Sequence, residues 1–269
     1  MSNSIKKDRI KLKSYYIAYL DILGISDAIK SKNSEDYLNN IYNLFDDVNK
    51  AVSHTNKNHQ RIKVIKKIFS DNIIIAIEKE PFFQETTEEI KQYLLIEMVS
   101  YLQLLGLKYS FLIRGGITTG NLYINNDFVY GEALLESYKL ESQNAIFPRI
   151  IISDKVINEY IQNNNIRSYL KKDFDGACYV DSFSTYFDLL NDYKNNIKNE
   201  INYIQEFLSS QIPQNDDYKI TQKKYWIINK FNEFCQNNNF EQYVIDIDKF
   251  PYDPNYIRTV VTGRARELV

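Results

Sequence analysis

The sequence predicts an α+β fold, with a mainly antiparallel sheet on a β-α-β-β-α-β core and a C-terminal helical appendage. Two observations support the core. Short runs rich in apolar and aromatic residues recur at strand length, and segments with apolar residues at helical spacing separate them. A third observation is a change to long helical patterns in the second half of the chain. We therefore expect a core over 1–153 and a mainly helical extension over 154–269, packed on the core.

The first strand is expected at Tyr15–Ile22, where Asp21 belongs to the alternate set and comes at the strand's end. Gly24 then breaks the strand. Ser34 is the expected N-cap of the following helix, because serine oxygens accept from free backbone N–H groups there. One apolar stripe runs along this helix: Leu38, Ile41, Phe45, Val48 and Val52.

Two further strands, Ile62–Phe69 and Ile73–Ile77, flank Ser70-Asp71-Asn72. These three residue types favour turns, so the segment predicts a hairpin with Asp71 at its tip. A helix follows over Thr86–Leu105. Gly106 is expected just beyond its C-terminus, where glycine commonly ends a helix.

The next strand is expected at Tyr109–Thr118, and Gly115-Gly116 permits a close backbone approach within it. A hairpin over Leu122–Tyr130, a helix from Gly131 to about 142 and a strand at Pro148–Ile152 complete the core. The order is that of a ferredoxin-like fold, and we expect its helices on one face of the sheet.

The extension contains a predicted strand at Ala177–Val180 and helices at Phe183–Leu208 and Gln222–Cys235, with a loop at Pro213–Asp217 between the helices. Its role is not evident from the sequence.

Composition narrows the classes of function. A formal net charge of −2 gives no basic field for a nucleic-acid partner. No apolar run approaches the ~20 residues of a membrane span, and the N-terminus lacks a secretory pattern, so we expect a cytoplasmic protein without membrane contact. Only two cysteines occur, which argues against a zinc cluster or a disulfide framework.

Two carboxylates stand at linked places in this fold, because Asp21 ends the first strand and Asp71 tips the neighbouring hairpin. Paired carboxylates can hold two hard divalent cations, Mg²⁺ or Mn²⁺, which activate an attacking oxygen and neutralise a leaving group. The alternative is that Asp21 caps the next helix and Asp71 is only a turn residue. Their joint placement favours the metal site.

Five motifs in order resemble those of class III nucleotidyl cyclases. They are Leu20–Ser26, Phe69-Ser70-Asp71, Arg114–Gly120, Tyr130-Gly131 and the pair Leu140-Glu141 with Pro148-Arg149-Ile150. The forms are most similar to the bacterial pyrimidine cyclases of Pycsar anti-phage defence. The resemblance covers about 15–153, and more weakly the helix around Lys224-Tyr225-Trp226.

This resemblance implies a reaction: the ribose 3′-oxygen of a nucleoside triphosphate attacks the α-phosphate, and pyrophosphate leaves. Asp21, Asp71 and the backbone carbonyl of Ile22 would ligate two divalent cations. Backbone N–H groups would cradle the triphosphate in one segment, formed by Leu23, Gly24, Ile25 and Ser26. The 3′,5′-cyclic product would serve as a second messenger for a separate effector.

The choice of base depends on two positions. Lys67 lies four residues before Asp71, where class III enzymes carry a base-reading lysine. A lysine only donates hydrogen bonds, so it favours uracil O4 over the cytosine amino group, and UTP over CTP. The alternative is an exposed lysine in a basic strand. Phe128 takes the place of the family's adenine-reading Asp, which argues against ATP.

The sequence departs from the family in the helix after Tyr130-Gly131. The family's Asn and Arg, which stabilise the transition state, fall on Leu135 and Lys139. Lys139 can replace the arginine as a point charge, without its bidentate fork. Arg114 or Arg149 are the other candidates, and either can equally be a structural ion pair. The family builds its sites across a homodimer, which we expect here too.

Other functions remain open. A cytidylate cyclase differs only in its base. The departures at Leu135 and Lys139 favour a catalytically inactive cyclase fold that senses nucleotides or dimerises, whereas retention of both aspartates argues against it. A polymerase-like palm shares the sheet and the two-metal logic.

Overall fold

The computed structural model describes residues 10–79, 85–160, 164–192, 197–211 and 217–246. The predicted loop at Pro213–Asp217 lies almost wholly outside the described residues. The core follows the predicted order. Its elements are β1 (Lys13–Leu23), α1 (Ile25–Lys30), α2 (Ser34–Asn58), β2 (Val64–Phe69), β3 (Asn72–Glu78), α3 (Glu85–Lys108) and β4 (Leu112–Ile124).

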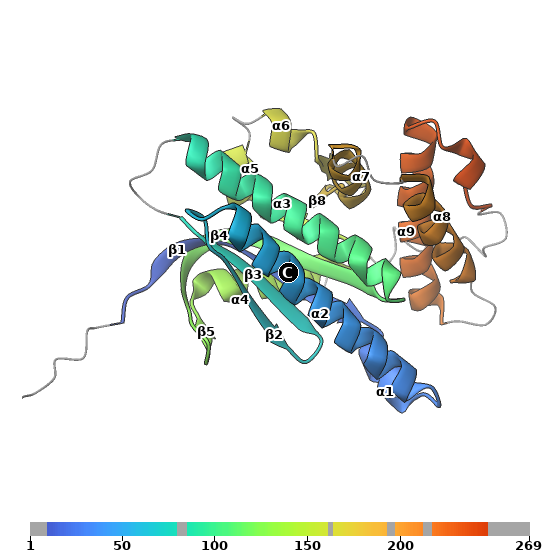
Figure 1. Ribbon diagram of the computed structural model, residues 1–269, viewed down its shortest axis with the longest axis horizontal. Coiled ribbons are helices and arrows are strands. Elements are labelled where there is room, and N and C mark those ends of the chain that lie inside the picture. Colours follow the sequence, from blue (N-terminus) through green and yellow to red (C-terminus); the bar gives the residue numbers. More distant parts are fainter. Residues whose placement is uncertain (1–9, 80–84, 161–163, 193–196, 212–216, 247–269) are drawn as a thin grey trace, which may run out of the picture.

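The sheet confirms the predicted α+β fold. Its order is β2-β3-β1-β4-β6-β8-β7, where β6 is Ile150–Ile152, β7 is Leu170–Lys172 and β8 is Cys178–Val180. The first four strands in this order are antiparallel to one another, as in a ferredoxin-like core. Figure 1 shows α2 and α3 running across this sheet. A short β5 (Val129–Tyr130) pairs with the end of β4. The last predicted core strand, β6 (Ile150–Ile152), is parallel to β4.

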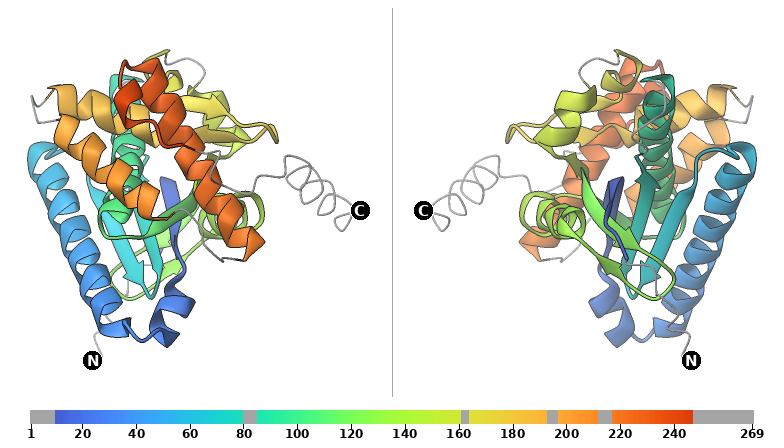
Figure 2. Two further views of the ribbon diagram at one scale, coloured as in Figure 1. Left: turned by 90° about the vertical axis from the view of Figure 1, so that its right-hand side faces the viewer. Right: turned by 90° about the vertical axis from the view of Figure 1, so that its left-hand side faces the viewer.

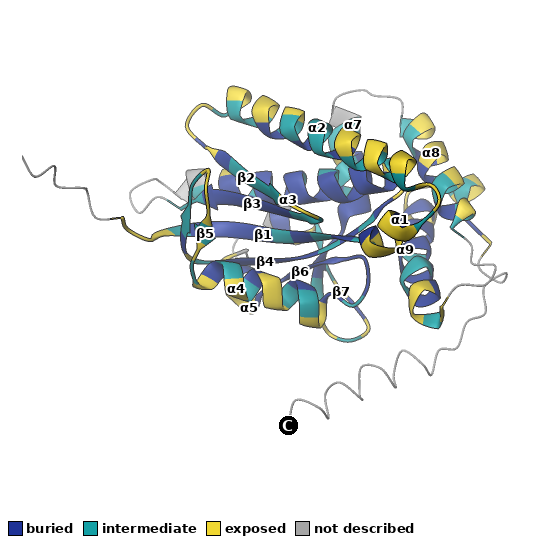
Figure 3. Cartoon of the chain, turned by 90° about the horizontal axis from the view of Figure 1, so that it is seen from below, coloured by how far each residue is buried: buried dark blue, intermediate teal, exposed yellow. Residues whose placement is uncertain are grey.

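Helices cover both faces of the sheet, which corrects the expectation of one face. In β1, Tyr16, Ala18 and Leu20 join a buried cluster with α2 and α3. The alternate residues Tyr15 and Ile17 pack with the opposite helix α4 (Glu132–Lys139). Figure 3 shows the sheet between these two layers. Both faces of β1 are apolar because both are buried.

Two predicted helix ends were wrong. Gly106 lies inside α3, which runs on to Lys108. A Cβ at Gly106 would stand 2.8 Å from Ile113 Cδ1, so the glycine serves close packing against β4 and does not end the helix. The N-cap of α2 is Asn33, and Ser34 is the helix's first residue. Such boundaries shift by a residue or two because helix ends fray.

The part after residue 153 contributes both strands and helices. Strands β8 (Cys178–Val180) and β7 (Leu170–Lys172) extend the sheet beyond β6. The described helices are α5 (Asp154–Tyr160), α6 (Asn164–Arg167), α7 (Ser182–Asp192), α8 (Ile197–Ser210) and α9 (Tyr218–Asn237). Helices α7 and α8 cover the described parts of the helix predicted over Phe183–Leu208, and 193–196 lie outside the described residues. Figure 2 shows α8 and α9, in orange to red, packed at one end of α3. The division at residue 153 stays a prediction.

A buried charge cluster joins β6 to this later part of the chain. The Arg149 guanidinium is fully buried, lies 2.5 Å from Asp173 Oδ2 and also pairs with Asp175. Trp226 of α9 donates to the same Asp173 oxygen at 2.8 Å. Charges taken out of water cost free energy unless paired, and each member here satisfies another. The cluster therefore fixes α9 and the β7–β8 turn against the core.

Breaking this cluster is expected to destabilise the whole protein. Arg149→Met leaves Asp175 without its cation and Asp173 with only the more distant Lys230, at 3.7 Å, so the free energy of unfolding should fall by about 3 kcal/mol. The matched control is Lys155→Met, which removes the partly exposed Lys155–Glu136 pair and should cost less than about 1 kcal/mol. Urea denaturation measures both. Equal losses would show that the buried cluster is not the stabilising contact.

Candidate active site

The register of the sheet assembles the site on the face covered by α4. Asp21 of β1 pairs directly with Asn72 of β3 on one side and with Arg114 of β4 on the other. Directly paired residues share a face. Asp71 precedes Asn72 in the turn between β2 and β3, as predicted. The structure therefore brings the two predicted metal-binding aspartates to one edge of one face.

A backbone contact sets the position of Asp71. The N–H of Ile22 donates to the Asp71 carbonyl oxygen at 2.9 Å, and Asn72 Nδ2 donates to Asp71 Oδ1 at 2.9 Å. Both aspartates are partly exposed, so their remaining oxygens can reach a ligand. Carboxylate and carbonyl oxygens are the donors that Mg²⁺ and Mn²⁺ prefer. The oxygens of Asp21 and Asp71 thus fit the predicted cations, and the role of the Ile22 carbonyl stays a prediction.

Within the described ranges, no group of three or more His, Cys, Asp or Glu side chains is arranged to hold a metal ion. This is compatible with the proposed cations, because Mg²⁺ is usually bound through one or two carboxylates, with substrate phosphates and water completing the shell.

The segment predicted to bind phosphate turns sharply after β1. Gly24 adopts φ +87°, a left-handed conformation that favours glycine, and Ile25 opens the short helix α1. Ile25 is buried, whereas Gly24 and Ser26 are exposed. The turn follows Asp21 by three residues and therefore lies next to the aspartates, as the resemblance implies.

Arg114 is the predicted cation that reaches this site. Its Nε donates to Asp21 Oδ2 at 3.1 Å, and its guanidinium also donates to the Ala145 carbonyl oxygen at 3.3 Å. A third contact joins it to Glu141, whose Oε1 lies 2.7 Å away without the alignment of a hydrogen bond. Arg114 therefore bridges two carboxylates from different elements.

Glu141 is the acidic residue whose role sequence reasoning missed. It lies in a π-helical turn, Leu140–Asn144, directly after α4, and is only 3% exposed. Gly116 of β4 admits this turn, since a Cβ there would stand 2.5 Å from both Leu140 Cβ and the Ser137 carbonyl oxygen. This confirms the close approach predicted at Gly115-Gly116. Two signals were available in the sequence: the Leu140-Glu141 motif, and the four-residue spacing of Ala133, Ser137 and Glu141, all three of which are buried.

The environment of Glu141 perturbs its ionisation. Burial raises the pKa of its carboxyl to about 7, Arg114 opposes this shift, and the nearby Asp21 and Asp71 charges add to it. Tyr19 lies two residues before Asp21 on the same face of the sheet. Burial raises the pKa of its hydroxyl to about 12, and the charges of Glu141 and Asp21 add to this shift. Its ring packs edge-on against Tyr138 of α4 at 5.6 Å.

The two residues at the predicted base-reading positions are both associated with the β4–β5 turn. Lys67 lies on the face that carries Asp21, through its pairing with Ile74, which in turn pairs with Tyr19. Its ammonium donates to the Asn125 carbonyl oxygen at 2.9 Å and to that of Asn126 in the β4–β5 turn. Phe128 belongs to the same turn and packs on Tyr123 at 5.1 Å. Two strands and two residues separate Lys67 from Asp21, on the order of 10 Å.

The other two predicted cations lie differently. Lys139 ends α4 and is exposed, as is Leu135 at 62% on the same helix. Arg149 is occupied by Asp173 and Asp175 in the buried cluster. The structure therefore favours the structural ion pair for Arg149, which was one of the two readings that the sequence left open.

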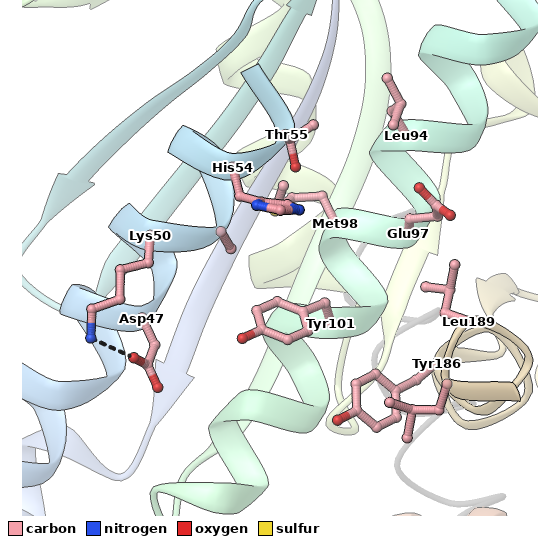
Figure 4. A pocket seen from close by; sticks show the side chains of 12 residues that line it. Asp47, Lys50, His54, Thr55, Leu94, Glu97, Met98, Tyr101, Tyr186 and Leu189 are labelled. Carbon is pink, nitrogen blue, oxygen red and sulfur yellow. Dashed lines mark hydrogen bonds and ion pairs between the residues drawn. The ribbon is translucent and has the colours of Figure 1, made fainter. Parts of the chain in front are cut away.

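A separate apolar cavity of about 470 Å³ lies between α2, α3 and α7 (Figure 4). Its walls include Leu94, Met98, Tyr101 and Tyr186. The two aspartates and Glu141 are not among its lining residues, so we assign the chemistry to the polar site and not to this cavity.

Comparison of the sequence with protein-family models finds no match, and comparison with curated proteins finds none either. Among the described helices, none combines the length and the apolar character needed to cross a bilayer.

The raised pKa of Glu141 predicts a pH dependence of stability. Because the folded state holds this proton up to about pH 7 and the unfolded state loses it near pH 4.5, the free energy of unfolding should fall as pH rises between these values. The slope from this group approaches about 1.4 kcal/mol per pH unit. Urea denaturation in metal-free buffer should show the slope reduced in Glu141→Gln. Identical pH profiles in both proteins would contradict the raised pKa.

Proposed function

We propose that this protein is a nucleotide cyclase that converts a pyrimidine ribonucleoside triphosphate, with UTP favoured, to its 3′,5′-cyclic monophosphate and pyrophosphate. One observation carries the proposal: Asp21 and Asp71 converge on one face, beside the Gly24 turn, with Ile22 bonded to the Asp71 backbone. The three further motifs that resemble those of class III cyclases lie in β4, at the start of α4 and between the end of α4 and β6, which also supports the proposal.

The chain's own residues would mainly position the substrate and neutralise its negative charge. Asp21, Asp71 and the Ile22 carbonyl would hold two divalent cations, which would supply activation of the ribose 3′-oxygen and neutralisation of the leaving pyrophosphate. The backbone N–H groups of 23–26 would bind the triphosphate. Arg114 lies beside Asp21 and supplies a guanidinium for developing phosphoryl charge. Such preorganised charge accounts for most of the acceleration in phosphoryl transfer.

The pyrimidine assignment rests on Lys67 and Phe128. Lysine has three N–H donors, and two carbonyl oxygens of the β4–β5 turn engage Lys67. A third donor remains for uracil O4. Phe128 has no carboxylate with which to accept from an adenine amino group. A cytidylate cyclase is the alternative if Lys67 serves only to anchor the turn.

We further propose a cytoplasmic homodimer with shared sites, whose product acts on a separate effector in anti-phage defence. The exposure of Leu135 and Lys139 supports the dimer, because these positions act on the partner's site in the family that the sequence resembles. Tyr130 is also exposed, at 66%, and lines one hollow with Leu135. Exposed apolar side chains of this size favour an interface.

The direct test is turnover. The purified protein is incubated with each of the four ribonucleoside triphosphates and Mn²⁺, and products are identified by mass spectrometry. We expect a cyclic pyrimidine monophosphate, and roughly a hundredfold loss or more in Asp71→Ala because a cation ligand is removed. Asp46→Asn, which alters a surface pair with Lys50, should retain activity.

Three outcomes would contradict the proposal. No turnover by the wild-type protein favours the inactive nucleotide-sensing fold. Linear or multi-nucleotide products favour a polymerase-like palm. Turnover that survives in Asp71→Ala excludes the proposed metal site.

Base selection is tested at Lys67. If its ammonium donates to uracil O4, Lys67→Met should lower the ratio of kcat/KM for UTP to that for CTP by about tenfold. The control Lys66→Met changes the neighbouring lysine, which alternates to the other face of β2. Equal losses for UTP and CTP would show instead that Lys67 only anchors the β4–β5 turn.

A further inference from the structure

Arg114 and the proposed cations compete for the same carboxylate. The Arg114 Nε lies 3.1 Å from Asp21 Oδ2. A divalent cation bound at Asp21 and a guanidinium in contact with that oxygen repel each other strongly at such separations in a partly buried site. Cation binding at Asp21 therefore requires Arg114 to break its contact with that carboxylate. An arginine with no second partner would then either move away from the site or obstruct it.

Glu141 supplies the second anchor. Its Oε1 lies 2.7 Å from Arg114 Nη2, a nitrogen that Asp21 does not contact, and the Ala145 carbonyl oxygen accepts from the third nitrogen, Nη1. Both partners belong to or directly follow the π-helical turn Leu140–Asn144. Gly116 lets that turn pack directly against β4, which fixes the turn that carries both partners next to Arg114.

We propose that Glu141 is a positioning residue that holds Arg114 at the rim of the site when cations occupy Asp21. Resting on the proposed function, this inference assigns a role to a buried acid that the metal site does not use. In the cation-free protein, Arg114 bridges Asp21 and Glu141. In the loaded protein, Arg114 stays on Glu141 and the Ala145 carbonyl, and its Nε–H is released toward the substrate phosphates.

Without the Glu141 charge, Arg114 has Asp21 as its single carboxylate partner in this cluster, and competes more strongly with the cations. Mutation of a residue that orients a metal ligand commonly changes the metal affinity by about 10–100-fold. A different explanation is that Glu141 contacts a cation directly. The two explanations differ in their dependence on Arg114, which a double-mutant cycle measures.

The experiment is Mn²⁺ binding, followed by the electron paramagnetic resonance signal of the free ion, in four proteins: wild type, Glu141→Gln, Arg114→Met and the double variant. We expect Glu141→Gln to weaken Mn²⁺ binding by about tenfold in the wild-type background and by less than about threefold in the Arg114→Met background. Equal weakening in both backgrounds, or none in either, would overturn the inference.

Controls separate this inference from the proposed function. Glu136→Gln changes another acid of the same helical segment, paired with Lys155, and should leave Mn²⁺ affinity unchanged. Glu141→Met carries the same expectation as Glu141→Gln if the glutamine variant does not fold. If wild-type protein binds no Mn²⁺, the proposed metal site fails and the inference with it. If wild type binds and the Glu141 variants match it, only the inference fails.

Discussion

The antiparallel register of β1 between β3 and β4 is the constraint on which the site depends. It places Asn72, Asp21 and Arg114 side by side across three strands. The turn that precedes Asn72 then carries Asp71 to the same edge, where Ile22 binds its backbone. A slip of one residue would turn Asp21 toward the apolar core under α2 and α3, where a carboxylate is costly. Fold and site therefore share one register.

Charge balance explains why this edge suits cations. Asp21 and Glu141 contact the guanidinium of Arg114, and the charge of Asp71 also acts on Glu141. Burial is the main cause of the raised pKa of Glu141, and the neighbouring aspartate charges add to it. Divalent cations at the aspartates would offset these charges, which links metal loading to the acid that the π-helical turn buries.

The fold was predictable from local pattern, because the core strands and helices have clear apolar periods and glycine or turn residues between them. The proximity of Asp21 and Asp71 was predictable because one ends the first strand and the other lies at the tip of the neighbouring hairpin. Two features were not accessible. Strand β7, and the pairing that adds it and the predicted strand β8 to the sheet edge, depend on long-range contacts that a three-residue run does not reveal. The environment of Glu141 depends on a π-helical turn, whose extra residue breaks the 3.6-residue period.

The three predicted cations now have distinct positions, and these bear on how a complete site is formed. Arg149 is committed to Asp173 and Asp175, and Arg114 to Asp21 and Glu141. Lys139 projects from the exposed end of α4. An exposed lysine contributes little inside its own chain, but on a helix that faces a second copy it can enter the partner's site as a point charge. In the dimer that we propose, each site would then draw one cation from each chain: Arg114 from the chain that holds the metals and Lys139 from its partner.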